Sequence, residues 1–173
     1  MRLLLDTHIL FWCLTNDDRL GQHHRELLLK PATEACVSAV SGWEIAVKVR
    51  LGKWPEAAVL LPGIAAKLQL ARMQVLPLSL DQAELAGSLL ASHKDPFDRL
   101  IAAQAIDLDI PLVTVDGAMK ELGLQIGLAL VRLPNASRLN LRSIPTQPIQ
   151  SRGSPCNCPP TRCSRARMAR SAG

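Results

Sequence analysis

The sequence predicts an α/β fold in which a parallel β-sheet carries helices on both of its faces. Two observations predict it. Short apolar runs alternate with helical patterns along the first 136 residues, and such alternation is typical of strand–helix–strand units. The runs are also almost continuously apolar, as expected of strands that are buried on both faces. With 173 residues, 48% of them hydrophobic and 20% charged, the chain has the length and composition of one globular domain.

The first expected strand begins near the N-terminus. Residues 2–5 form a short apolar run that stops at Asp6, and residues 9–14 follow with a helical pattern. A second helix is expected over residues 20–30, because their apolar side chains recur at helical spacing and Pro31 ends the pattern.

A second strand–helix unit follows in the middle of the chain. Residues 35–40 are compatible with a strand, and residues 41–50 predict a helix that opens with Ser-Gly-Trp-Glu. Residues 56–70 have a helical pattern that the Pro62-Gly63 pair should break. Residues 73–78 resemble a brief strand interrupted by a proline.

Two more helices are expected before the last predicted strands. Residues 81–84 have the acid-x-x-Glu spacing of a helix start, and the expected buried stripe of that helix consists of Leu85, Leu89 and Leu90. Another start lies at Asp95-Pro96, since Asp95 can cap a helix and proline suits the first helical position. Residues 100–106 are apolar almost all round, which predicts a buried helix.

The predicted domain ends in strands and is followed by a tail of different composition. Residues 111–115 form a β-rich run that ends at the Asp116-Gly117 turn, and a weak strand is expected over residues 128–133. Residues 1–136 hold 13 Lys and Arg against 15 Asp and Glu, whereas residues 137–173 hold 7 Lys and Arg and no acid. Because this tail is rich in proline and lacks apolar periodicity, we expect it to be disordered.

Composition also bears on the compartment. No apolar run approaches the roughly 20 residues that a membrane-spanning helix needs, which excludes an integral membrane protein of that kind. The apolar start before Asp6 is too short for a secretory signal, and five cysteines do not form the paired pattern of a secreted disulfide-rich domain. We therefore expect a cytoplasmic protein with reduced thiols.

Four carboxylates are expected at one edge of the predicted sheet. Asp6 and Asp116 follow strands directly, and Glu44 and Asp98 lie in first turns of helices that start from the same edge. Ligands bind at this edge of parallel sheets. Clustered carboxylates call for a divalent cation, and oxygen ligands without His or Cys favour Mg²⁺ or Mn²⁺. The natural chemistry of such a site is hydrolysis of a phosphodiester.

Two of these acids also have ordinary structural interpretations that the sequence leaves open. Asp6 is placed to cap the helix that follows it, and Asp116 is placed to hold a turn with Gly117. Either role alone would account for an aspartate at that position.

The same question applies to the two acids on helices. Glu44 stands three residues after Ser41, which is the spacing of a capping box. Asp98 is not needed to cap its helix, because Asp95 already stands at the cap position. We therefore assign Asp95 to capping and treat Asp98 as a candidate ligand.

Other polar and aromatic residues have two interpretations each. His8 is placed to hydrogen-bond substrate or to pack on the sheet edge, and Arg99 is placed to bind phosphate or to lie in solvent. Trp43 is interpreted as a packing residue or as a stacking platform for a base. Three tail cysteines, at 156, 158 and 163, resemble half a zinc site without a fourth nearby ligand. No Walker-type, G-x-G-x-x-G or G-x-S-x-G motif is present.

Four motifs in order resemble those of a PIN-domain ribonuclease of the VapC toxin type. They are Leu3-Leu-Leu-Asp-Thr-His8, Val37-Ser-Ala-Val-Ser-Gly-Trp-Glu-Ile-Ala46, His93-Lys-Asp-Pro-Phe-Asp-Arg-Leu-Ile-Ala-Ala-Gln-Ala105 and Leu112-Val-Thr-Val-Asp116. The resemblance covers residues 1–133 and implies a PIN-like three-layer α/β/α sandwich. It also implies metal-dependent cleavage of RNA, a homodimer, and a cognate VapB-type antitoxin that lies across the active-site groove.

The resemblance also assigns site residues. The acidic positions of the family fall on Asp6, Glu44, Asp98 and Asp116, and Thr114 matches a polar position that lines the family's site. Two other functions remain open from the sequence. A haloacid-dehalogenase-type phosphatase would use Asp6 as its nucleophile, but that chemistry needs a second Asp where His8 stands. A non-catalytic interaction module would leave the acids as helix caps.

Overall fold

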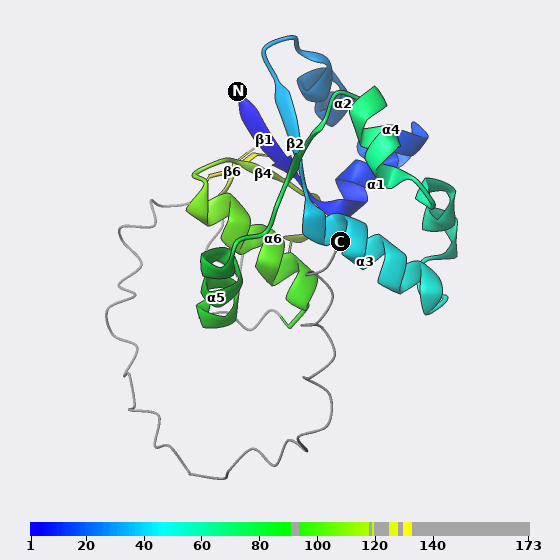
Figure 1. The fold of residues 1–173 in the computed structure, drawn as a ribbon. Helices are drawn as coiled ribbons and strands as arrows, with labels where there is room; N and C mark the ends of the chain where they lie inside the picture. The colour runs from blue at the N-terminus through cyan, green and yellow to red at the C-terminus, as the bar shows by residue number, and fades with distance from the viewer. Residues whose placement is uncertain (91–93, 118, 120–124, 128–129, 133–173) are drawn as a thin grey trace, which may run out of the picture. The chain divides into compact units, whose positions relative to one another are not determined.

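A six-stranded sheet forms the middle layer of the described structure (Figure 1). The computed structural model describes residues 1–90, 94–117, 119, 125–127 and 130–132. The strands have the spatial order β3-β2-β1-β4-β6-β5. Their bounds are β1 Arg2–Leu5, β2 Glu34–Ser38, β3 Gln74–Leu76, β4 Leu112–Val113, β5 Gln125–Gly127 and β6 Leu130–Arg132. The first four strands are parallel, whereas β6 pairs antiparallel with both β4 and β5.

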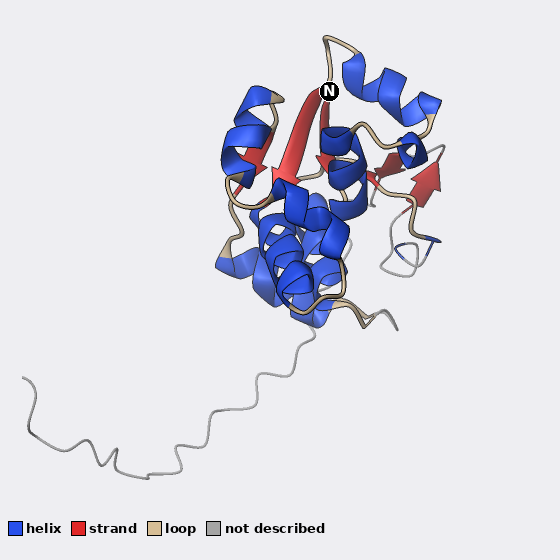
Figure 2. Cartoon of the chain, turned by 90° about the vertical axis from the view of Figure 1, so that its right-hand side faces the viewer, coloured by secondary structure: helices blue, strands red, loops and turns tan. Residues whose placement is uncertain are grey.

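Helices cover both faces of this sheet, as Figures 1 and 2 show. The α-helices are α1 Thr7–Thr15, α2 Gln22–Leu29, α3 Ala39–Arg50, α4 Ile64–Leu70, α5 Leu80–Ser88 and α6 Pro96–Asp107. Two 3₁₀ helices, η1 Asp18–Leu20 and η2 Pro55–Leu60, join some of them. Among the described residues, no helix is both long and apolar enough to cross a membrane.

Each face of the sheet has its own apolar core. In β1, Leu3 and Leu5 point to one face, where they pack with residues of α1, α2 and α4. Leu4 points to the other face and packs with residues of α6, among them Ile101 and Ala105. This alternation follows from the two-residue period of a strand. The fold is therefore the predicted three-layer α/β/α sandwich around a central parallel sheet.

The strand order places a topological switch point between β1 and β4. The chain moves outward from β1 through β2 to β3, and then returns to pair β4 with the opposite side of β1. Leu5 pairs with Val37 on one side and with Val113 on the other. The residues that follow these three strands consequently meet at one edge, where parallel α/β folds bind their ligands.

The buried helix predicted over residues 100–106 is confirmed as part of α6. The Asp95 carboxylate accepts a hydrogen bond of 2.9 Å from the Phe97 backbone N–H, and Pro96 occupies the first turn. Residues 101–106 are all buried between the sheet and α5. The cap fixes where α6 begins, and the apolar surface fixes where it packs.

Two predicted helix starts lie one or two residues too late in the chain. The helix expected from Ser41 begins at Ala39, because the Ser38 hydroxyl accepts the Val40 N–H and caps it. The helix expected from residue 81 begins at Leu80, because Ser79 and Gln82 form a reciprocal capping box. In both places a serine upstream of the expected start satisfies the free backbone groups of the first turn.

Other corrections concern element type and burial. Residues 55–60 form a 3₁₀ helix instead of the expected α-helix, and Leu90 is fully exposed instead of belonging to a buried stripe. The strand expected over residues 111–115 is limited to two residues, and the last weak strand is the second arm of a hairpin. The expected domain end at residue 136, the basic tail and its cysteines lie outside the described residues.

Candidate functional site

Asp6 lies at the switch point, directly after β1 and at the N-cap position of α1. Its side chain makes no capping hydrogen bond. Instead, its Oδ2 accepts a hydrogen bond of 2.7 Å from the Thr114 hydroxyl, and the residue is only 3% exposed. The capping interpretation of this carboxylate is therefore wrong. A buried carboxylate held by one hydroxyl keeps oxygen lone pairs for a further partner.

Thr114 joins the two acids that follow strands. Its hydroxyl donates to Asp6 and accepts a hydrogen bond of 3.0 Å from the Asp116 backbone N–H. This second bond holds the chain after β4 so that Asp116 stands beside the switch point. Thr114 is buried, whereas Asp116 is exposed.

Glu44 is the second buried acid of this edge. It projects from α3 and is 2% exposed. Its Oε2 accepts a hydrogen bond of 2.6 Å from the Thr7 hydroxyl, and its Oε1 pairs with Lys48 one turn further along α3. The predicted capping box with Ser41 is wrong, because Ser38 caps the helix and the Ser41 hydroxyl lies 3.0 Å from that of Thr7.

Burial sets the protonation behaviour of Asp6. Removal from water raises the pKa of this carboxyl above its ordinary value, and the negative charge of Glu44 raises it further. The Thr114 hydrogen bond and the nearby His8 act in the opposite direction without cancelling the effect of burial. Asp6 and Glu44 thus act on each other electrostatically across the gap between α1 and α3.

Lys48 connects Glu44 to the start of α6. Burial disfavours its positive charge, but the hydrogen bond and charge of Glu44, with the charges of Asp95 and Asp98, outweigh burial and raise the pKa of its amine. Asp98 is half-buried in the first turn of α6, as predicted. The charges of Glu44 and Asp98 therefore both act on the Lys48 amine.

The donors at this edge are all oxygen atoms, which suits a hard divalent cation. Within the part of the chain that is described, no three side chains of the types His, Cys, Asp and Glu form a group arranged to hold a metal ion. Two separate links are present instead: the Thr114 hydroxyl bonds the Asp6 carboxylate and the Asp116 backbone N–H, and the Lys48 amine pairs with Glu44 and is acted on by the charge of Asp98. Mg²⁺ keeps several waters and needs only one or two carboxylates, so this donor set fits a hydrated ion.

Two further predicted site residues have structural partners. His8 is exposed on α1 and stacks on Trp54, with ring centroids 4.6 Å apart. Arg99 turns toward the C-terminal end of α5, where its guanidinium donates to the carbonyls of Ala86 at 3.0 Å and Leu89 at 2.6 Å. These bonds satisfy carbonyls that a helix end leaves without partners. The geometry thus gives Arg99 a role in fixing α5 beside α6.

Sequence reasoning missed Thr7 and Lys48 as members of the site. The position of each residue in the sequence could have indicated its place in the site. Thr7 directly follows Asp6, and Lys48 stands four residues after Glu44, which is the spacing of an ion pair on a helix surface. Their function depends on contacts between α1 and α3 that spacing alone does not specify.

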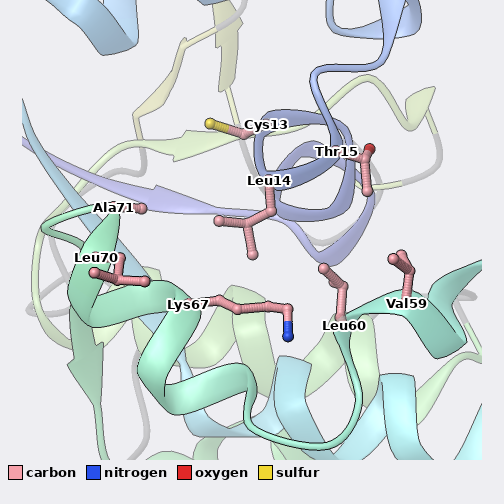
Figure 3. A pocket seen from close by; sticks show the side chains of 8 residues that line it. All are labelled: Cys13, Leu14, Thr15, Val59, Leu60, Lys67, Leu70 and Ala71. Atoms are coloured by element: carbon pink, nitrogen blue, oxygen red, sulfur yellow. The ribbon is translucent and has the colours of Figure 1, made fainter.

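Two pockets lie apart from these acids. One, of about 570 Å³, is shown in Figure 3. It is lined by Cys13, Leu14, Thr15, Val59, Leu60, Lys67, Leu70 and Ala71. A second pocket, of about 720 Å³, shares Cys13 and Ala71 with the first. No carboxylate of the sheet edge lines either pocket, so both are separate from the candidate site.

Comparison with known proteins identifies the family. No curated protein matches the chain. Among solved structures, the chain is similar to VapBC2 from Rickettsia felis bound to a DNA fragment from their promoter. The two are 23% identical with a TM-score of 0.51, over 70% of this chain and 93% of that one.

The chain is also similar to Mycobacterium tuberculosis VapC20, a sarcin-ricin loop cleaving toxin. Here the identity is 22% and the TM-score 0.50, over 70% of this chain and 95% of that one. Both likenesses concern the fold.

The family assignment itself comes from the sequence. The PIN domain family matches residues 3–124, which include both strands of the switch point and all four candidate acids. The observed sandwich is the fold that this match implies. The chain belongs to the PIN domain family.

Proposed function

We propose that this protein is a metal-dependent endoribonuclease that acts as the toxin of a VapBC-type toxin–antitoxin pair. The observation that carries the proposal is the pair of buried carboxylates, Asp6 and Glu44, held by threonine hydroxyls at the switch point of a PIN domain. Lys48 compensates the charge of Glu44, whereas the Thr114 hydroxyl that holds Asp6 is neutral. A buried carboxylate is costly unless a cation or a proton compensates it, so a divalent cation bound at this edge would stabilise Asp6.

Four carboxylates would serve a divalent cation in this proposal. Asp6 and Asp98 would be the principal ligands of Mg²⁺ or Mn²⁺, and Glu44 and Asp116 would complete or orient the hydrated ion. When bound, such an ion polarises a phosphate and lowers the pKa of a coordinated water. It would also offset the repulsion between these acids and the phosphates of RNA.

The chain's own residues would then position and deprotonate the nucleophile. The Thr114 and Thr7 hydroxyls fix the carboxylates of Asp6 and Glu44. One carboxylate accepts the proton of the attacking water as a general base. Attack in line with the leaving 3′-oxygen breaks the P–O3′ bond and leaves a 5′-phosphate and a 3′-hydroxyl. The proposal keeps His8 and Arg99 as candidate substrate contacts, and His8 is exposed two residues after Asp6.

The proposed biological setting includes two protein partners. A VapB-type antitoxin would inhibit the enzyme, and a second copy of the chain would form a homodimer. The similarity to a VapBC complex and to an RNA-cleaving VapC toxin supports this setting. An enzyme that cleaves the RNA of its own cell would act in the cytoplasm.

Cleavage of RNA by the purified full chain tests the proposal. A mixed pool of tRNA and rRNA is incubated with Mg²⁺, with Mn²⁺ or with EDTA, and Asp98→Asn is compared with Asp81→Asn. Asp81 is an exposed acid in the first turn of α5 and serves as the matched control. We expect metal-dependent fragments that Asp98→Asn loses and Asp81→Asn keeps.

Other outcomes would contradict the proposal. Fragments that persist in EDTA, or in Asp98→Asn, would remove the carboxylate mechanism. A folded wild-type protein that binds neither Mg²⁺ nor Mn²⁺ would favour the non-catalytic module. Growth arrest on expression that survives Asp98→Asn would also indicate binding instead of hydrolysis.

A further inference from the structure

An aromatic pair lies beside the acids and is not used by the proposed mechanism. Trp43 on α3 and Phe97 on α6 contact each other edge to face, with ring centroids 4.8 Å apart and an angle of 63° between the rings. Each stands one residue before a candidate acid, Glu44 or Asp98. The pair therefore bridges the two helices that supply those acids, which pack against each other.

The exposure of Trp43 separates it from the other tryptophans of the chain. Trp12 and Trp54 are partly buried against the core on the α1 face of the sheet. Trp43 is 54% exposed, although an indole is one of the largest apolar surfaces that a side chain can offer to water. Burying it would be favourable, at about 25 cal/mol per Å². A residue placed only for packing would be expected to be covered, as the other two are.

The contact with Phe97 fixes the orientation of the exposed ring. Edge-to-face pairs are a preferred arrangement of aromatic side chains, so Phe97 limits the rotation of Trp43. Phe97 is itself half-buried and packs against the core under α6. The Lys48 amine also lies 5.8 Å from the Phe97 ring centroid. The result is a fixed aromatic face with a positive charge nearby, at the border of a site proposed to act on phosphodiesters.

We propose that Trp43 stacks on an RNA base next to the phosphate that is cleaved. The inference rests on the proposed function, because it assigns a substrate contact to the same site. Every base has a π face, and stacking on an exposed aromatic is a recurrent way to hold single-stranded RNA. Positioning one base would fix the adjacent phosphate against Asp6, Glu44 and Asp98. Trp43 would thus be a substrate-positioning residue.

Photochemical cross-linking with the full chain tests this contact. A 12-nucleotide single-stranded RNA containing 5-iodouridine is irradiated with the protein in Ca²⁺ instead of Mg²⁺, so that a divalent cation offsets the charge of the acids while cleavage is suppressed, and cross-linked peptides are identified by mass spectrometry. We expect the main cross-link at Trp43, and we expect unlabelled RNA to compete with it. A cross-link map without Trp43 would overturn the proposal.

Affinity for the same RNA provides the second readout. Trp43→Leu keeps an apolar side chain without a π face, Trp43→Phe keeps a smaller aromatic, and Leu80→Ala removes an exposed apolar residue elsewhere. Base–aromatic stacking predicts roughly a tenfold loss of affinity in Trp43→Leu, with Trp43→Phe and Leu80→Ala within about threefold of wild type. A loss in Trp43→Leu that is accompanied by a lower molecular mass in sedimentation would overturn the proposal and assign Trp43 to a contact between copies.

The cleavage assay separates this inference from the proposed function. Cleavage by wild type without a Trp43 cross-link would reject the stacking contact and keep the nuclease. A competed Trp43 cross-link without cleavage would keep the stacking contact as an RNA-binding feature and reject the nuclease.

Discussion

The Thr114 hydroxyl donates a hydrogen bond of 2.7 Å to Asp6, although 108 positions separate the two residues in the chain. The parallel pairing of β1 with β4 brings them together, because Leu5 pairs with Val113 and the next residue of each strand follows at the same edge. The same hydroxyl accepts the Asp116 N–H. One neutral side chain therefore holds the Asp6 carboxylate and the backbone of Asp116 without adding a charge that would compete with a cation.

Replacing Thr114 with valine should reduce both stability and activity. Valine keeps the shape of the side chain but removes the hydroxyl that bonds the buried Asp6 carboxylate. Loss of a hydrogen bond to a buried polar group costs roughly 1–3 kcal/mol, and a misplaced carboxylate should lower the cleavage rate at least about tenfold. Urea unfolding and initial rates measure the two effects. Thr114→Ser restores the hydroxyl, so a serine variant as impaired as the valine variant would contradict this role.

Replacing Asp6 with asparagine should abolish cleavage while stabilising the fold near neutral pH. Burial raises the pKa of the Asp6 carboxyl above its ordinary value of 3.8. At a pH between the ordinary pKa of the unfolded chain and the raised pKa of the folded protein, the Asp6 carboxyl keeps its proton in the folded protein but has lost it in the unfolded chain. Rising pH therefore favours unfolding through this window. Asparagine removes the free-energy cost of burying an ionised carboxylate, and its side-chain carbonyl can still accept the Thr114 hydrogen bond.

The sign of this effect has a clear signature in melting curves. We expect Asp6→Asn to melt above wild type at neutral pH when both are measured in EDTA, so that no divalent cation compensates the carboxylate. The difference should shrink as the pH falls through the raised pKa, and should vanish below about 3.8, where the carboxyl is protonated in both states. A variant that is less stable than wild type at neutral pH would show that the Asp6 charge contributes to the fold.

Much of this architecture is predictable from the sequence because strand and helix periodicities are local properties. The apolar run before Asp6 and the apolar surface of α6 specify buried elements whatever surrounds them. The edge on which the acids gather follows from parallel pairing, because residues after parallel strands share one edge. That reasoning places Asp6 and Asp116 correctly beside the switch point.

The sequence could not resolve competition between equivalent groups. Ser38 and Ser41 are both suitable caps for α3, and only the position where β2 ends selects Ser38. The other serine is left beside Thr7, which the sequence did not identify as a partner of Glu44. The guanidinium of Arg99 can donate equally well to a phosphate or to the carbonyls of a helix end. The packing of α6 beside α5 directs it to the carbonyls.

Removing the amine of Lys48 should destabilise the protein by leaving Glu44 as an unpaired buried charge. Glu44 is 2% exposed at its side chain, whereas Lys48 is 24% exposed, so part of the interaction is screened by water. We expect Lys48→Met to cost roughly 1–3 kcal/mol of unfolding free energy, below the 3–5 kcal/mol typical of a fully buried pair. Denaturant titration measures this loss.

A double-variant cycle tests the reason for that loss. Glu44→Gln removes the charge but can still accept the Thr7 hydrogen bond, so Lys48→Met combined with Glu44→Gln should recover most of the lost stability. If the two losses simply add, the pair is not coupled and Lys48 stabilises the fold through its aliphatic stem instead.

Replacing Arg99 with alanine should weaken the fold more than it weakens catalysis. The guanidinium donates to the Ala86 and Leu89 carbonyls at the end of α5, and these bonds join α5 to α6. Because the residue is partly exposed, we expect a loss of roughly 1–2 kcal/mol of unfolding free energy. Lysine carries its three donors on a single nitrogen instead of on a planar fork, so Arg99→Lys should restore only part of the lost stability.

Steady-state kinetics distinguish this structural role from phosphate binding. For the structural role, the KM for RNA in Arg99→Ala should stay within about twofold of wild type below the melting transition, and its dependence on salt should be unchanged. A phosphate contact would instead raise the KM and reduce the salt dependence, since each neutralised phosphate releases counterions. A large rise in KM in a variant of unchanged stability would return Arg99 to the substrate-binding site.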